Sequence, residues 1–173
     1  MKKIICLLVI LISIIAIVFI TKKDVKSEYE ILNNKKDYIK VNIPKDNSFK
    51  YINYKELSQK LKLTSVIYIG RNDDQASRDS INQLQKASDE TGIDTIYYID
   101  IRQVKKNKLK KVLRNNIYYP SLIISKNGKI KNYIYQKNKK YKKMSKTEKT
   151  KLKETYVKAI DSTIICNTEE PDC

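Results

Sequence analysis

The sequence contains no histidine and no tryptophan, and it has only three glycines and three prolines among 173 residues. Histidine is the commonest general base and a common ligand of transition metals, so its absence excludes Ser-His-Asp and Cys-His centres built from this chain alone. Gly70 and Gly128 are far apart, which excludes a glycine-rich phosphate-binding loop. The carboxylates are scattered, and no pair is spaced for acid–base catalysis. The sequence therefore predicts no cofactor, no metal site and no recognisable catalytic centre.

Positive charge dominates, since 36 lysines and arginines outnumber 19 acidic residues and give a formal net charge of +17. Such an excess favours anionic partners: lipid headgroups, cell-wall polyanions, nucleic acid or an acidic protein. The lysines are spread along the chain, which favours a solvated lysine surface. One cluster, Lys137 to Lys143, is a candidate contact for anionic lipid or cell-wall polymer. The abundance of Lys, Ile, Asn and Tyr is typical of an AT-rich bacterial genome.

One long apolar run lies near the N-terminus, from Ile4 to Ile20. Its length of about 17 residues is the lower limit for a helix that spans a bilayer. Lysines flank both ends, and no small-residue cleavage site follows. We therefore predict that residues 1–21 form an uncleaved, single-pass signal anchor in the cell membrane, with the remainder outside the cytoplasm. Secretion after cleavage near Thr21 is the alternative. Nucleic acid is not an expected partner in that location.

The remaining chain divides into a polar tether over 22–50, a globular domain over 51–165 and a tail over 166–173. Within the tether, one short strand is predicted over 38–43. In the domain, runs of β-branched and aromatic residues predict strands, and apolar residues spaced three and four apart predict helices. A capping box, Ser145 to Glu148, opens the last helix. The predicted strands cover 65–69, 95–99, 119–125 and 130–135, and the predicted helices cover 54–61, 76–91, 104–113 and 146–165.

This order gives a βαβ unit followed by a β-hairpin and a helix, which predicts an α/β fold with three layers, α/β/α, around a mixed sheet. Three segments carry a resemblance: the strand and turn Val66 to Arg71, the segment Tyr119 to Ile124, and the hairpin turn Lys126 to Lys129. Together they resemble the thioredoxin fold, in which the second segment holds a cis-proline. The stretch Tyr68-Ile69-Gly70-Arg71 resembles bacteriocin transport accessory proteins, which are thioredoxin-like.

The sequence departs from that family where the family has its redox cysteines. Asp74 and Ser77 occupy the two positions of the Cys-x-x-Cys motif. Disulfide exchange needs one thiolate that attacks and a second thiol that resolves the mixed disulfide, and a carboxylate and a hydroxyl do neither. We expect Asp73 or Asp74 to cap the following helix instead.

The resemblance also implies a binding site that needs no cysteine. In thioredoxin-like proteins, the main chain beside the cis-proline pairs with an extended peptide, a mode that depends on backbone hydrogen bonds. The corresponding groove here would be formed by five residues: Arg71, Asp74, Ser77, Tyr119 and Pro120.

Two cysteines, Cys166 and Cys173, bracket the C-terminal tail. Outside the cytoplasm such a pair is expected to be oxidised. The preferred interpretation is a structural disulfide that closes the tail, and the alternative is a displaced redox pair. Zinc is not expected, because two cysteines without histidine leave a tetrahedral site incomplete.

The predicted function is therefore that of a membrane-anchored accessory or binding protein without thioredoxin-type redox chemistry. The resemblance implies a role in export, maturation or immunity around a bacteriocin, with an exported peptide or a transport or immunity protein as partner. Two alternatives remain open: a thiol-disulfide oxidoreductase that uses Cys166 and Cys173, and a basic protein that binds cell wall or anionic lipid.

Overall fold

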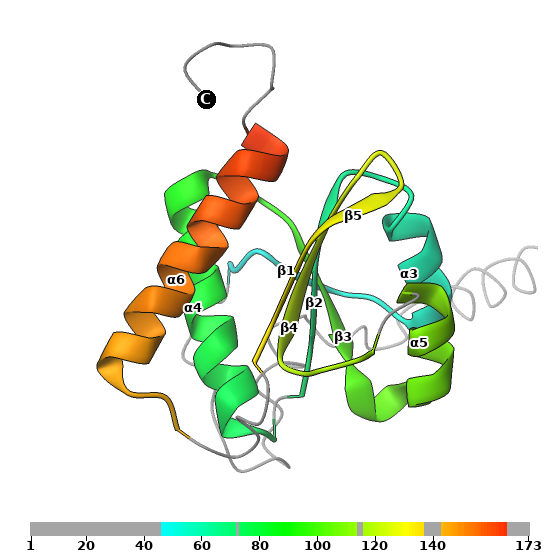
Figure 1. Ribbon diagram of the computed structural model, residues 1–173, viewed down its shortest axis with the longest axis horizontal. Coiled ribbons are helices and arrows are strands. Elements are labelled where there is room, and N and C mark those ends of the chain that lie inside the picture. The colour runs from blue at the N-terminus through cyan, green and yellow to red at the C-terminus, as the bar shows by residue number, and fades with distance from the viewer. Residues whose placement is uncertain (1–45, 72, 114–115, 137–142, 166–173) are drawn as a thin grey trace, which may run out of the picture.

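The structure is a computed structural model that describes residues 46–71, 73–113, 116–136 and 143–165. Figure 1 shows a sheet between two helical layers, with α4 and α6 on one face and α3 and α5 on the other. The strands are β1 (Phe49–Tyr51), β2 (Ser65–Gly70), β3 (Ile96–Asp100), β4 (Ser121–Lys126) and β5 (Lys129–Tyr135). The helices are α3 (Tyr54–Lys60), α4 (Gln75–Thr91), the 3-10 helix η2 (Ile101–Gln103), α5 (Lys106–Leu113), α6 (Lys146–Ile160) and the π-helix η3 (Asp161–Ile165).

The strands form one sheet in the order β1-β3-β2-β4-β5. The strands β1, β3 and β2 run parallel to one another, while β4 is antiparallel to β2 and β5 is antiparallel to β4. A parallel βαβ half joined to an antiparallel ββα half is the arrangement that the sequence predicts. The described residues therefore have a thioredoxin-like fold, and the predicted mixed sheet between helical layers is confirmed.

Strand β1 is an addition to the predicted elements, and its first two residues fall in the segment assigned to the tether. It is only three residues long, and it pairs with β3, far along the chain. Phe49 is buried, and its ring meets the edge of Tyr68 at a centroid distance of 6.4 Å. Tyr51 makes a second edge contact, with Tyr98 at 6.1 Å. A strand fixed by such contacts and by a distant partner leaves no periodic signal in its own sequence. The strand predicted over 38–43 lies outside the described residues.

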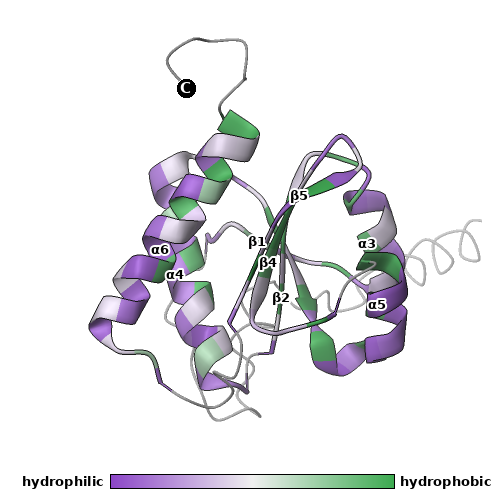
Figure 2. Ribbon diagram, viewed as in Figure 1, coloured by the Kyte–Doolittle hydropathy of each residue, from purple (hydrophilic) through white to green (hydrophobic). Residues whose placement is uncertain are grey.

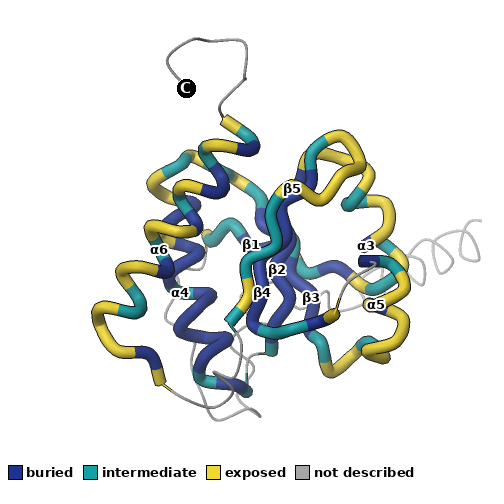
Figure 3. The backbone as a smooth tube through the Cα atoms, viewed as in Figure 1, coloured by how far each residue is buried: buried dark blue, intermediate teal, exposed yellow. Residues whose placement is uncertain are grey.

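Two apolar clusters lie on opposite faces of the sheet. Figure 2 shows hydrophobic segments in the sheet and in the helices of both layers. Along β2, Val66 and Tyr68 face α4 and α6, while Ile67 and Ile69 face α3 and α5. Every residue of β2 is buried, which explains its continuous apolar run. Figure 3 shows this strand as the buried centre of the molecule.

Some predicted element ends shift for local physical reasons. The strand predicted over 119–125 begins at Ser121, because Pro120 has no N–H with which to join a ladder. The predicted last helix is α-helical to Ile160 and then changes to the π-helix η3. The capping box of Ser145 and Glu148 is confirmed.

None of the helices in the described ranges is long and apolar enough to cross a bilayer. The segment Ile4–Ile20, for which an anchor is predicted, lies outside those ranges.

Two ion pairs connect α4 to α6. The buried carboxylate of Asp79 accepts hydrogen bonds from Lys149 Nζ at 2.8 Å and from the main-chain N–H of Met144 at 2.9 Å. Nearer the other end of α4, the exposed carboxylate of Glu90 contacts Lys153 Nζ at 2.6 Å. The Asp79 pair is buried and also satisfies a main-chain donor, so it contributes more to stability than the Glu90 pair.

We predict that Asp79→Ala lowers the free energy of unfolding by about 2–3 kcal/mol, because it leaves the Met144 N–H buried and unpaired. The matched variant Glu90→Ala removes the exposed pair on the same two helices and should cost less than about 1 kcal/mol. Urea unfolding of the full chain, followed by circular dichroism, measures both values. Equal losses in the two variants would contradict the assignment.

Candidate functional site

The loop between β2 and α4 and the segment before β4 lie at the same edge of the sheet. Ile69, near the end of β2, pairs with Ser121, the first residue of β4. Gly70 and Pro120 are the next residues in the two directions, so the loop that starts at Arg71 lies beside Pro120. The structure thus brings together the two segments that the sequence assigns to a groove.

Asp74 and Ser77 form a closed hydrogen-bond network at the start of α4. Asp74 Oδ2 accepts from the Ser77 N–H at 2.9 Å and from the Ser77 hydroxyl at 2.8 Å. The Ser77 hydroxyl oxygen also accepts from the N–H of Arg71 at 3.3 Å. Asp74 is the N-cap of α4, which confirms one of the two caps considered. Both side chains are fully buried, so they stabilise the helix terminus and are shielded from any ligand.

An ion-pair cluster that no sequence pattern indicated lies at the same edge. Asp73 is paired with Arg71 on its own loop and with Arg102 of η2, at 3.5 Å from Arg102 Nη1. Arg102 in turn binds Asp100 at the end of β3, and its Nε lies 3.0 Å from each carboxylate oxygen. The hydrogen bond from Arg71 is the main cause that holds the pKa of Asp73 below its ordinary value.

The sequence contains the charged residues of this cluster, but only the strand order shows that they lie close together. Polar residues follow β2 and β3 directly, and the carboxyl ends of neighbouring parallel strands meet at one edge of a sheet. The consequence is that Arg71 and Asp73 are joined by charge pairs beside the segment that contains Pro120.

The peptide bond between Tyr119 and Pro120 is cis, as the resemblance implied. On both sides of this bond the main chain is engaged: the carbonyl of Pro120 accepts from Gln136 N at 3.1 Å, and Tyr118 N donates to Tyr133 Oη at 3.1 Å. The main chain of Tyr119 takes part in no hydrogen bond with other described residues. Tyr119 is also partly exposed, so its main chain is the candidate for pairing with a ligand.

The five residues assigned to the groove differ in their access to solvent. Asp74, Ser77 and Pro120 are buried, whereas Arg71 and Tyr119 are partly exposed. A ligand at this edge would meet the side chains of Arg71 and Tyr119 and the free main chain of Tyr119. Substitutions at the buried three would disturb folding before they disturbed binding, so they are poor probes of the groove.

Several other predicted sites lie outside the described residues. They are Cys166 and Cys173 of the tail, and the basic cluster up to residue 142, of which only Lys143 is described. In the described ranges, no group of three or more His, Cys, Asp or Glu side chains is placed to hold a metal ion.

Comparisons with known proteins extend to the fold alone. No family model matches the sequence, and no curated protein sequence matches it. Among solved structures, oxidised thioredoxin O2 from Arabidopsis thaliana is 20% identical, with 63% of this chain and 91% of that chain covered and a TM-score of 0.47. Oxidised thioredoxin O1 from the same plant is 19% identical, with 63% and 97% covered and a TM-score of 0.45. A designed protein is 21% identical, with 68% and 92% covered and a TM-score of 0.46.

We predict that Asp74→Ala lowers the free energy of unfolding by about 2–3 kcal/mol, because the variant loses the N-cap and leaves the buried Ser77 hydroxyl without its acceptor. Asp74→Asn keeps a side-chain oxygen that caps a helix and should cost about 1 kcal/mol or less. Chemical unfolding of the full chain tests both variants. If Asn and Ala cost the same, the capping role is refuted.

Proposed function

We propose that this chain is a thioredoxin-like binding protein that holds an extended peptide beside Tyr119 and Pro120 and performs no disulfide exchange there. The observation that carries this proposal is that Asp74 and Ser77 form a buried hydrogen-bonded pair. The resemblance assigns these two positions to the redox cysteines. Neither side chain forms a thiolate, and both already serve the terminus of α4. The fold therefore keeps its binding edge without the redox pair.

The mode of binding follows from the free main chain of Tyr119. An extended peptide that pairs with it would gain main-chain hydrogen bonds, and the partly exposed Tyr119 ring and Arg71 guanidinium would contact its side chains. Arg71 is held in place by its ion pair with Asp73. A preorganised edge of this kind reduces the entropy that is lost on binding.

We further propose that the protein is anchored in the cell membrane and acts in a bacteriocin system. The uncharged run Ile4–Ile20 supports a single-pass anchor in the cell membrane, with the domain outside the cytoplasm. The Tyr68-Ile69-Gly70-Arg71 stretch supports an accessory role in bacteriocin export, maturation or immunity. The proposed partner is accordingly an exported peptide or a transport or immunity protein of that system.

Disulfide exchange separates this proposal from the oxidoreductase alternative. We expect the full chain in detergent to show no catalysed reduction of insulin by dithiothreitol, and Cys166→Ser to behave identically. Turnover in the unmodified chain that disappears in Cys166→Ser would overturn the proposal.

Photo-crosslinking tests the peptide edge directly. A photoreactive phenylalanine analogue in place of Tyr119 preserves the aromatic ring, and the same analogue in place of exposed Lys110 on α5 is the control. In the source cells, we expect a peptide adduct from position 119 and none from position 110, with mass spectrometry identifying the adduct. The same adduct from both positions, or none from position 119, would contradict the assignment of this edge.

A further inference from the structure

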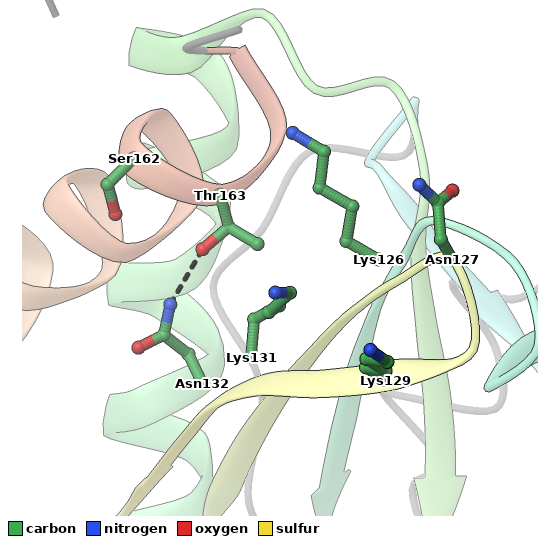
Figure 4. Close-up of a pocket in the computed structure, with 7 residues that line it drawn as sticks. All are labelled: Lys126, Asn127, Lys129, Lys131, Asn132, Ser162 and Thr163. Carbon is green, nitrogen blue, oxygen red and sulfur yellow. Dashed lines mark hydrogen bonds between the residues drawn. The ribbon is translucent and has the colours of Figure 1, made fainter. Parts of the chain in front are cut away.

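A second candidate site lies at the opposite end of β4 from Pro120. There a cavity of about 610 Å³ opens between the β4–β5 hairpin and η3 (Figure 4). Three lysines line it, Lys126, Lys129 and Lys131, and its other lining residues are neutral and polar. Among the described residues, no carboxylate lines the cavity, so the charges of this described lining are all positive.

A β-bulge gathers these lysines. The pairing between β4 and β5 shifts by one residue: Ile124 pairs with Asn132, but Lys126 pairs with Lys129, which leaves Lys131 as the extra residue. Ile124 and Lys126 are two positions apart on β4 and share a face of the sheet. Their partners Asn132 and Lys129 therefore also share a face, although they are three positions apart on β5. Without the bulge, Lys129 would face the other side.

This arrangement is unfavourable unless an anion is present. Lys126 and Lys129 are directly opposite each other, and like charges in that position destabilise a strand pair. Among the described residues, no acidic side chain forms an ion pair with any of the three pocket lysines. On neighbouring α6, by contrast, Lys149 and Lys153 are both paired with carboxylates.

The neutral lining adds hydrogen-bond donors. Asn132 Nδ2 donates to Thr163 Oγ1 at 2.6 Å, as drawn in Figure 4, and Thr163 is only 6% exposed. Because the Thr163 oxygen is used as an acceptor, its O–H is left to donate, and no acceptor for it occurs among the described residues. The ammonium groups are also donors only. The cavity thus offers donors and positive charge to a ligand rich in acceptors.

We propose that this lysine pocket binds a phosphate group, carried either by a soluble phosphate compound or by the headgroup of an anionic phospholipid. Lysine ammonium groups bind phosphate as point charges, and the cavity volume is in the range of small-molecule sites. The pocket and the peptide edge are separated by the length of β4, about 20 Å. The pocket is therefore independent of the proposed peptide function, and either can fail without the other.

Calorimetric titration of the full chain in detergent with pyrophosphate tests the site. The variant Lys129→Gln/Lys131→Gln should bind at least about tenfold more weakly, because two charge-assisted hydrogen bonds are lost. The control Lys106→Gln/Lys110→Gln changes the net charge equally at exposed positions of α5, and its affinity should stay within about twofold. Equal weakening in both variants, or no binding by the unmodified chain, would overturn the proposal.

A second titration identifies the source of the phosphate. Short-chain phosphatidylglycerol is compared with phosphatidylcholine of the same chain length. A preference for phosphatidylglycerol that the pocket variant abolishes supports a lipid headgroup, whereas pyrophosphate binding without that preference supports a soluble ligand. If the pocket variant alters neither titration, the site is refuted.

Substitutions at Thr163 distinguish binding at a defined site from general electrostatic attraction to a basic protein. Thr163→Val removes the buried donor and should weaken pyrophosphate binding several-fold, and Thr163→Ser should restore it. Thermal unfolding of each variant is measured in parallel. If the lysine variant lowers the melting temperature and leaves binding unchanged, the lysines serve the C-terminus of the neighbouring helix and the proposal fails.

Discussion

The burial of β2 on both faces is the constraint on which the rest of the structure depends. Its side chains alternate between two apolar clusters, so each face of the sheet must be covered by helices. It pairs with β3 in parallel and with β4 in antiparallel orientation. Because β4 is antiparallel to β2, the end of β2 lies beside the start of β4. The candidate peptide edge exists because these two ends meet there.

Tyr68 links this buried strand to the site. Its ring stacks on Tyr98 at 6.0 Å, and its hydroxyl donates to the carbonyl of Ser77 at 2.7 Å. Burial raises the pKa of Tyr68 well above its ordinary value, so the hydroxyl stays protonated as a donor. A Cβ at Gly70 would lie 2.6 Å from a Tyr68 ring atom, and glycine at that position leaves room for the ring. Core packing and the position of α4 are therefore coupled at one residue.

The two ends of β4 present different chemistry. At one end, Tyr119 offers an unpaired main chain next to an ion-paired loop. At the other end, a bulge in β5 brings together lysines that form no ion pair with a described carboxylate, beside a buried threonine. An accessory protein that held a peptide at one end and a phosphate group at the other would use both without a thiol in either site.

The sequence by itself determined the fold class, because continuous apolar runs, helical spacing and capping residues are local signals. It also supplied the hypothesis that Asp74 and Ser77 stand where the resemblance places the two redox cysteines. Only the tertiary structure decided which groove residues are accessible, because burial depends on residues far apart in the chain. Strand β1, the contact of Arg102 with Asp73, and the lysine pocket also required it, since each is fixed by pairing and register across the sheet, which no local pattern records.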